Sequence, residues 1–432
     1  MNSFELFKSV YKKFRFFTYY SYNGPMKLLH TADWHLGKRL EKYSRLDEQQ
    51  AVLDEFIALA DKNEVDVVLV AGDLFDAFNP AVEAVELLYK SLKRLSKNGE
   101  RLVIALACNH DSPDRIDAPD VLARECGILF AGYPHATIAA GALCNGFRII
   151  RSEPGFIELQ VPGYQYPLRL LLTPYANEYR MKTFLGVANE EEEMRNVLGA
   201  HWQQLATKYC DNRGVNILMA HLFVMKKGAL PPEEPADEKP ILHIGGAQAI
   251  YSENIPENLQ YVALGHLHRY QEIDRDRLPI VYSGSLLSYS FAEAGQQKNV
   301  VLIQAEPGKK ASFEKLPLTS GKPLYRKRFE TIPEAVEWLQ QCGEAWIELT
   351  MVSDDFMHAE DRKQLLQAQS GIVTIIPEIR NKLGIAEGGK AIDLSLSIEE
   401  LFAQYFSFKS GQQPNNELMA LFKEIRAEQV NE

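Results

Sequence analysis

The chain has 432 residues, of which 46% are hydrophobic and 24% charged, and its formal net charge is −11. This length and apolar content predict one large domain and at least one smaller one. No apolar run approaches the roughly 20 residues of a membrane span, which excludes a transmembrane protein. The negative charge argues against a stand-alone nucleic-acid binder, although a local patch, bound metal ions or a partner subunit could supply a positive field.

The five cysteines are scattered along the chain and include no CxxC pair. An odd number without paired spacing argues against a disulfide framework and against a structural zinc site. We therefore expect a protein of the reducing cytoplasm.

Residues 1–25 differ from the rest of the chain because they combine basic and aromatic side chains. They lack a smooth apolar core and a small-residue cleavage site, so they make a poor secretory signal. They predict either a flexible extension or a start placed upstream of the natural one. The second interpretation is favoured, because the sequence from Met26, MKLLHTAD, is typical of a first strand.

From Lys27 onward, short apolar runs alternate with amphipathic segments. Strands are predicted at Lys27–Ala32, Val65–Ala71 and Leu102–Ala107, and helices at Leu46–Asn63, Ala81–Leu95 and Asp120–Glu125. Further strands are predicted at Phe156–Val161, Leu168–Thr173, Val215–Ala220, Tyr261–Leu264, Pro279–Tyr282 and Val300–Gln304. This alternation indicates an α/β core with a strand-rich second half.

A composition break near residues 307–310 separates a second region. This region predicts a small α+β domain, with elements at Phe313–Leu316, Ile332–Gln340, Trp346–Val352, Ala359–Gln367 and Ile372–Ile376. The chain then passes through a glycine-rich turn and ends with two helix candidates, Ile398–Phe406 and Asn416–Glu428.

The residues that carry chemistry fall in five short segments, each at the end of a predicted strand. They are Asp33-Trp34-His35, Gly72-Asp73, Asn109-His110-Asp111, His221 and Gly265-His266-Leu267-His268. In open α/β sheets, ligands collect at the carboxyl ends of the strands. Each segment alone is commonly structural, but the five in this order indicate one site.

Counted as metal ligands, these segments offer two carboxylates, one amide oxygen and four imidazoles, with His110 left over. The set is Asp33, His35, Asp73, Asn109, His221, His266 and His268. Mixed nitrogen and oxygen donors suit Mn²⁺, Fe²⁺ or Zn²⁺ better than Mg²⁺. Seven ligands are too many for one open catalytic ion. Two ions ~3.5–4 Å apart and bridged by one carboxylate would use them all, in an arrangement suited to phosphoester hydrolysis.

The order D-x-H, GD, NHD, H and GHxH resembles the calcineurin-like metallophosphoesterase superfamily. The segments HTADWHLGKRL, VLVAGDLFDAFNP, NHDSPDRID, YVALGHLHRYQ and YSGSLLSYSFAEAGQQKNVVLI further resemble the SbcD family of nuclease subunits. The resemblance covers essentially Met26 to the C-terminus. The metal motifs alone specify only the superfamily, whereas DWHLG, GDLFD and SGSLLSYSF narrow it to SbcD.

The resemblance implies an αββα fold, a two-sheet β-sandwich flanked by helices, for a nuclease domain over residues 26–307. It implies an α+β capping domain over 318–390, which would help to position DNA, and C-terminal helices for partner binding over 397–430. It also implies two divalent ions, with Mn²⁺ as the expected metal.

The same resemblance assigns roles to the motif residues. The first ion would be held by Asp33, His35 and His268, the second by Asn109, His221 and His266, and both by Asp73. His110 would protonate the leaving alkoxide or stabilise the transition state. Asp111 would orient the His110 ring through a hydrogen bond.

One residue departs from the family pattern, which usually reads GNHD where this chain has Cys108 before Asn109. A cysteine would be strained if the position needs a positive φ, and tolerable if it needs only a small side chain. A buried, inert cysteine is favoured over a catalytic thiol. Every ligand remains in place, so activity is expected.

The two C-terminal helix candidates each carry an apolar face at helical spacing. The faces consist of Leu401, Phe402, Tyr405 and Phe406 in the first helix and Leu418, Leu421, Phe422 and Ile425 in the second. They could pack on their own domain or bind a partner. The SbcD resemblance implies the second, docking on the coiled-coil base of an SbcC-type ATPase.

The leading hypothesis is a Mn²⁺-dependent DNA nuclease that cleaves phosphodiesters at duplex ends and hairpins. It would act in DNA repair and recombination with an SbcC-type ATPase, as a homodimer within a heterotetramer. Two alternatives stay open. One is a small-molecule phosphoesterase of the same superfamily, such as a nucleotidase. The other is an inactive scaffold whose tail recruits a partner and whose site is disabled by a strained Cys108.

Overall fold

The computed structural model describes residues 24–181, 190–230, 249–353, 357–379, 398–410, 414, 418–419 and 422. The chain divides into two compact units, Met1–Val352 with Met357–Glu378, and Ser353–Phe356 with Ile379–Glu432. The predicted N-terminal extension and most of the helix candidate at Asn416–Glu428 lie outside the described residues. Within the described part of the chain, no helix has the length and apolar character to cross a membrane.

The first sheet has six strands in the order β18-β17-β1-β4-β5-β6. Its strands are β1 (Met26–Thr31), β4 (Val67–Val70), β5 (Leu102–Leu106), β6 (Ile128–Ala131), β17 (Asn299–Ala305) and β18 (Ser312–Pro317). Strands β1, β4, β5 and β6 run parallel, whereas β17 and β18 are antiparallel to their neighbours. The strand predicted at Phe313–Leu316 therefore belongs to this sheet and not to the small domain, because β18 pairs with β17 along its whole length.

The second sheet has eight strands in the order β15-β16-β14-β11-β10-β9-β8-β7. Its strands are β7 (Gly141–Ala142), β8 (Arg148–Glu153), β9 (Phe156–Gln160), β10 (Leu168–Thr173), β11 (Val215–His221), β14 (Tyr261–Gly265), β15 (Gln271–Asp274) and β16 (Ile280–Tyr282). The central strands β10, β11, β14 and β16 are parallel. The sequence patterns did not predict β6, β8 or β15.

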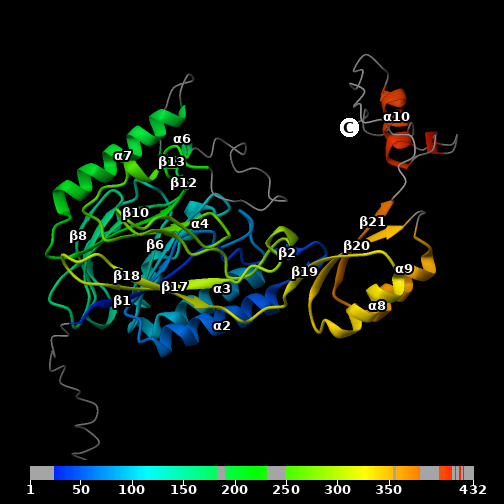
Figure 1. The fold of residues 1–432 in the computed structure, drawn as a ribbon. Coiled ribbons are helices and arrows are strands. Elements are labelled where there is room, and N and C mark those ends of the chain that lie inside the picture. The colour runs from blue at the N-terminus through cyan, green and yellow to red at the C-terminus, as the bar shows by residue number, and fades with distance from the viewer. Residues whose placement is uncertain are drawn as a thin grey trace, which may run out of the picture. The chain divides into compact units, whose positions relative to one another are not determined.

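The two sheets pack face to face, and helices cover their outer faces (Figure 1). Helices α2 (Leu46–Lys62) and α3 (Val82–Leu95) pack on the first sheet, and α7 (Glu190–Tyr209) packs on the second. Because side chains alternate along a strand, Leu28 points between the sheets while Leu29 packs under the helices. The predicted αββα architecture is confirmed.

Shorter elements complete the first unit. They are β2 (Arg39–Leu40), β3 (Tyr43–Ser44), α4 (Pro113–Asp117), α5 (Asp120–Glu125), α6 (Glu178–Met181), β12 (Val224–Met225) and β13 (Ile250–Tyr251), together with short 3₁₀ turns. Most of them follow strands at the edge of the sandwich where the motif residues lie.

The small α+β domain is a three-stranded sheet with two helices. It consists of β19 (Leu324–Phe329), α8 (Ile332–Gln341), β20 (Trp346–Ser353), α9 (Ala359–Ala368) and β21 (Ile372–Ile379). Helix α8 begins after Thr331, whose side chain accepts a hydrogen bond from the backbone N–H of Glu334. Buried side chains of α8, α9 and the sheet form its own apolar core. The domain limits 26–307 and 318–390 stay predictions, and residues 380–390 lie outside the described part.

The second unit contains α10 (Ile398–Ser410). The ring of Phe402 on this helix stacks on the ring of Phe422, with centroids 4.0 Å apart and an interplanar angle of 9°. The two predicted apolar faces therefore meet at these rings. Ile425 lies outside the described residues.

A buried hydroxyl holds the loop that follows β11. The Tyr282 hydroxyl accepts from the backbone N–H of Val224 at 2.6 Å and donates to the carbonyl oxygen of Leu222 at 2.7 Å. We expect Tyr282→Phe to lower the free energy of unfolding by about 1–3 kcal/mol, because it leaves a buried backbone N–H without its acceptor. Urea denaturation would measure the change. Tyr179→Phe is the matched control, since Tyr179 is 82% exposed, and equal stability of the two variants would contradict the prediction.

Candidate metal centre

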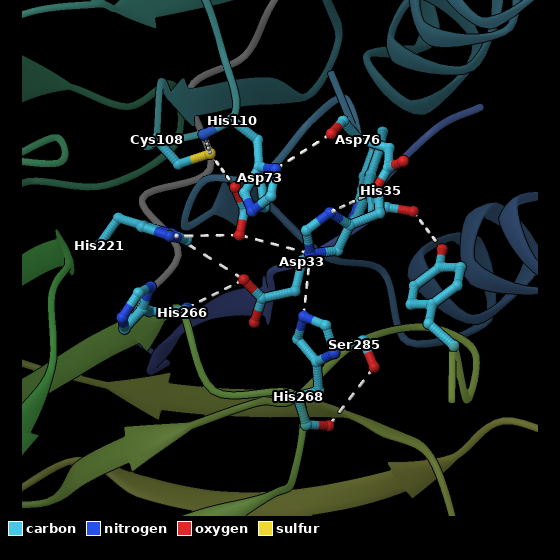
Figure 2. A network of polar contacts seen from close by, with 12 residues as sticks. Asp33, His35, Asp73, Asp76, Cys108, His110, His221, His266, His268 and Ser285 are labelled. Carbon is cyan, nitrogen blue, oxygen red and sulfur yellow. Dashed lines mark hydrogen bonds and ion pairs between the residues drawn. The ribbon is translucent and has the colours of Figure 1, made fainter. Parts of the chain in front are cut away.

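Six of the seven predicted ligands converge at one edge of the sandwich from the ends of both sheets (Figure 2). These six are at most 5% exposed: Asp33, His35, Asp73, His221, His266 and His268. The first three follow β1 and β4 of the first sheet, and the histidines at 221, 266 and 268 end or follow β11 and β14 of the second. The seventh, Asn109, follows β5 and is exposed.

Four of these ligands have a backbone conformation that L-residues rarely adopt. The φ angles are 54° at Asp33, 45° at His35, 52° at Asp73 and 107° at His266. Such positive φ angles cost on the order of 1–3 kcal/mol each and are concentrated at functional sites. The surrounding backbone enforces them, since the N–H of Asp33 donates to the carbonyl of Gly72 and the N–H of His35 to that of Asp73.

Two glycines of the motifs allow the sheets to approach each other. A Cβ on Gly72, where φ is 95°, would lie 2.3 Å from His221 Nδ1. A Cβ on Gly265 would lie 1.9 Å from the carbonyl oxygen of Ala71. The contact between the two sheets therefore requires the glycines that precede Asp73 and His266.

The first cluster of donor atoms contains His35, His268 and Asp73. The Nε2 atoms of His35 and His268 are 2.9 Å apart, and His35 Nε2 lies 3.4 Å from Asp73 Oδ2. Two imidazole nitrogens that point at the same place beside a carboxylate oxygen form a donor set for one cation.

The second cluster forms on the other side of the same carboxylate. His221 Nε2 lies 3.3 Å from Asp73 Oδ2. His221 Nδ1 is 2.7 Å from the carbonyl oxygen of Ala71, and because a carbonyl only accepts, Nδ1 carries the proton and Nε2 keeps its lone pair. Asp73 Oδ2 thus lies between two histidines that come from different sheets.

Buried polar atoms without partners test whether this donor set suits cations. Asp33 Oδ2, His221 Nε2 and His266 Nε2 are buried and make no hydrogen bond to the described residues, although Asp33 Oδ1 accepts from the N–H of His266. Burial raises the pKa of Asp33 to about 7 and lowers the pKa of His266 to about 3. A carboxylate in this position needs nearby positive charge and the imidazole stays neutral, so the residues fit divalent ions.

Comparisons with known proteins give the chain its family. The family model for calcineurin-like phosphoesterases matches residues 26–270. The chain is 35% identical over 411 residues to the SbcD subunit of the SbcCD nuclease of Bacillus subtilis, covering 93% of this chain and 97% of that one. It is 33% identical over 304 residues to the same subunit from Rhodobacter capsulatus, covering 70% and 71%. The chain belongs to the SbcD family of metal-dependent nuclease subunits.

Among solved structures, a dimetal phosphatase from Danio rerio aligns with 69% of this chain and all of its own, at 13% identity and a TM-score of 0.36.

His110 lies at the rim of this SbcD metal centre, and a hydrogen bond holds its imidazole ring in one orientation. Its Nδ1 is 3.0 Å from the carbonyl oxygen of Asp76, so Nδ1 donates and Nε2 faces away from that bond. The ring centroid lies 5.1 Å from that of His35. His110, which the sequence analysis left out of the ligand set, therefore lies beside the ligand His35.

Asp111 does not hold His110 in the way that the sequence suggested. Its carboxylate accepts three backbone hydrogen bonds, from Leu74, Phe75 and Cys108, at 2.9–3.2 Å. It therefore fastens the loop after β4 to the loop after β5, and the Asp76 carbonyl orients the ring of His110 instead.

Arg180, which lies outside every sequence motif, fixes the same loop from the other side. Its guanidinium donates to the carbonyl oxygens of Cys108 at 2.6 Å and Asp111 at 2.9 Å, and the residue is only 6% exposed. No local pattern identifies an arginine that lies 69 residues or more along the chain from the groups it binds.

Glu293 is a second residue for which no sequence motif predicted a role, although its segment helped to indicate the SbcD family. Its Oε1 lies 3.6 Å from His268 Nδ1, and the ammonium of Lys298 donates to its Oε2. Burial opposes ionisation, but the Lys298 charge lowers the pKa of Glu293 to about 2. An ionised carboxylate beside Nδ1 favours a proton on that atom and directs the Nε2 lone pair of His268 toward the cluster.

We expect Glu293→Gln to weaken divalent-ion binding by about 10–100-fold, because the amide removes the charge that orients His268. Isothermal titration of the purified protein with Mn²⁺ would measure the affinity. Glu306→Gln is the matched control, since Glu306 pairs with Lys309 on the surface. Unchanged affinity in Glu293→Gln would show that His268 needs no carboxylate partner.

Proposed function

We propose that this chain is a two-metal DNA nuclease that hydrolyses phosphodiesters at duplex ends and hairpins, acting with an SbcC-type ATPase. The observation that carries the proposal is the Asp73 carboxylate between two histidine clusters, with His110 at the rim. In the proposed ligand set, Asp73 serves both ions. The remaining ligands are Asp33, His35 and His268 for one ion and Asn109, His221 and His266 for the other.

The proposed roles divide the chemistry between the ions and the chain. Two divalent ions, when bound, supply the positive charge that polarises the phosphodiester and favours ionisation of the attacking water. We propose Mn²⁺, because the donor set mixes imidazole and carboxylate. The Asp76 carbonyl accepts from His110 Nδ1, and in the imidazolium form Nε2 carries a second proton, which it gives to the leaving oxygen. Asp111 and Arg180 hold the loop on which His110 lies.

A nucleic acid as the substrate is supported by the SbcD relatives, which are named as nuclease subunits. The net charge of −11 agrees with a division of DNA binding between this chain, its ions and its partner. We also propose that residues 318–390 form a cap that positions DNA. Its Trp346 donates to Glu48 of α2 at 2.8 Å, which fastens the small domain to the nuclease core.

The proposal is tested with end-labelled duplex DNA and Mn²⁺. We expect His110→Ala to lower the rate of cleavage by about 10²–10⁴-fold, because the leaving oxygen loses its proton donor, while the variant still binds two Mn²⁺ ions. His135→Ala is the control, since His135 lies outside the ligand set. Full activity of His110→Ala would refute its role as an acid.

The same preparation separates the alternatives. A nuclease should hydrolyse bis-p-nitrophenyl phosphate in preference to p-nitrophenyl phosphate, whereas preference for the monoester would favour the nucleotidase. Absence of both metal uptake and hydrolysis would favour the scaffold. The observed geometry supports an enzyme, because the six buried ligand side chains converge with Cys108 in place.

The C-terminal unit is proposed to dock on the coiled-coil base of the ATPase. Tyr405 on α10 is 60% exposed, while Leu401, Phe402 and Phe406 are half-buried. The Phe402–Phe422 stack joins α10 to the following segment, so these two rings belong to one apolar surface. Leu418 and Ile425 complete the proposed partner-binding set. An exposed apolar surface on α10 is what a coiled-coil partner would cover.

We expect Phe402→Ala to weaken binding of the ATPase subunit by about tenfold or more, because the stacked rings fix the two segments of the docking surface. Titration calorimetry with the ATPase would measure the affinity. Gln404→Ala on the exposed side of α10 is the control. Equal affinity of the two variants would favour a tail that packs on its own domain.

Two further proposals concern assembly and location. Val82 on α3 and Val121 and Leu122 on α5 are 75–78% exposed, which supports a homodimer formed through helices of the nuclease domain, within a heterotetramer. All five cysteines are free thiols, which agrees with a location in the reducing cytoplasm.

A further inference from the structure

Cys108 stands where the family pattern has glycine, in the loop between β5 and Asn109. It is fully buried and is not among the described non-glycine residues with a positive φ. The strain that a cysteine would suffer in the left-handed region therefore does not arise. The position accepts a side chain, and the direction of that side chain determines whether the thiol reaches the metal centre.

The thiol points into the metal centre (Figure 2). Cys108 Sγ donates a hydrogen bond to Asp73 Oδ1, while Oδ2 of the same carboxylate faces His35 and His221. The sulfur, an oxygen of Asp73 and a ring nitrogen of His221 all lie within 4.8 Å of one another. Sulfur, oxygen and nitrogen donors thus surround one place.

An independent observation indicates that this place receives a cation. His221 is 0% exposed, its Nδ1 is used by the Ala71 carbonyl, and its Nε2 makes no hydrogen bond within the described part of the chain. That lone pair is directed at Asp73, on the side where the sulfur lies. A buried ring nitrogen without a donor is costly unless a cation binds it.

We propose that Cys108 Sγ is an additional ligand of the ion at Asp73 and His221, and that it raises the affinity of this position for soft cations such as Zn²⁺ and Cd²⁺ above the affinity that a glycine at residue 108 would give. A glycine at this position offers no donor. Thiolate ligands favour soft and borderline metals such as Cd²⁺ and Zn²⁺, whereas carboxylate and amide oxygens also suit Mn²⁺. The inference rests on the proposed two-ion function and specifies which metals its second position prefers.

Binding of a cation to the Cys108 sulfur releases one proton from the thiol. The metal–sulfur bond forms as the S–H bond breaks, and the proton leaves to solvent. In the absence of a soft cation the group is a thiol that donates to Asp73.

The test uses the full chain, stripped of metal and titrated with Cd²⁺. Cadmium bound to thiolate gives a near-ultraviolet charge-transfer band that nitrogen and oxygen ligands do not give. We expect the wild type to bind two Cd²⁺ ions with a band equivalent to one thiolate. Cys108→Gly and Cys108→Ser should bind two ions without the band, and their preference for Zn²⁺ over Mn²⁺ should fall by about tenfold or more.

Cys210→Ser is the matched control, because Cys210 is also buried but lies in the core beneath α7, and it should keep the band. A wild type that binds two Cd²⁺ without the band, or a band that persists in Cys108→Ser, would overturn the inference and leave the proposed nuclease intact. Failure of the wild type and of Cys108→Gly to bind two Mn²⁺ ions would instead overturn both.

Discussion

Six buried donor side chains from two different sheets, among them the Asp73 carboxylate, meet at one edge of the sandwich, and this electrostatic constraint governs the rest of the site. Ionised carboxylates and lone pairs removed from water cost several kcal/mol each unless cations or hydrogen bonds compensate them. The protein satisfies part of this demand itself. The Asp33 carboxylate receives a backbone N–H, and His221 and His268 are each engaged through Nδ1. The remaining lone pairs face one another and form a donor set for divalent cations.

The segments around the ligands are shaped to maintain that convergence. Asp111 joins the loops after β4 and β5 through three backbone amides, and Arg180 holds two carbonyls of the second loop. Glu293 and Lys298 hold His268 from the opposite side. These contacts involve charged groups that are almost fully buried, where hydrogen bonds to charge are strongest. The loops are therefore rigid supports for the ligands, in spite of their positive φ angles.

Much of the site could be predicted from the sequence, because its ligands follow directly from strand ends. The strands that precede Asp33, Asp73 and Asn109 are parallel neighbours in one sheet, so their carboxyl ends must share an edge. The histidine segments end parallel neighbours of the second sheet for the same reason. Local periodicity was enough to locate each of these strands within two residues.

The supporting residues could not be predicted, because their partners are distant in the chain. Asp111 binds amides 36 and 37 residues away, and the strand at Ser312–Pro317 takes its place only through pairing with β17. No spacing rule connects such pairs. The conformation at Cys108 was equally beyond the sequence, since a glycine in the family pattern is compatible with either sign of φ.

The origin of the ligands in separate sheets has a consequence for the stability of the whole sandwich. An ion held by Asp73 and His221, as proposed, would cross-link two layers that otherwise adhere through apolar packing, so separation of the layers would require release of the ion. A ligand that binds only the folded chain and is present at a hundred times its dissociation constant adds about 2.7 kcal/mol to the free energy of unfolding. The supply of divalent metal would thereby determine the stability of the folded protein as well as its chemistry.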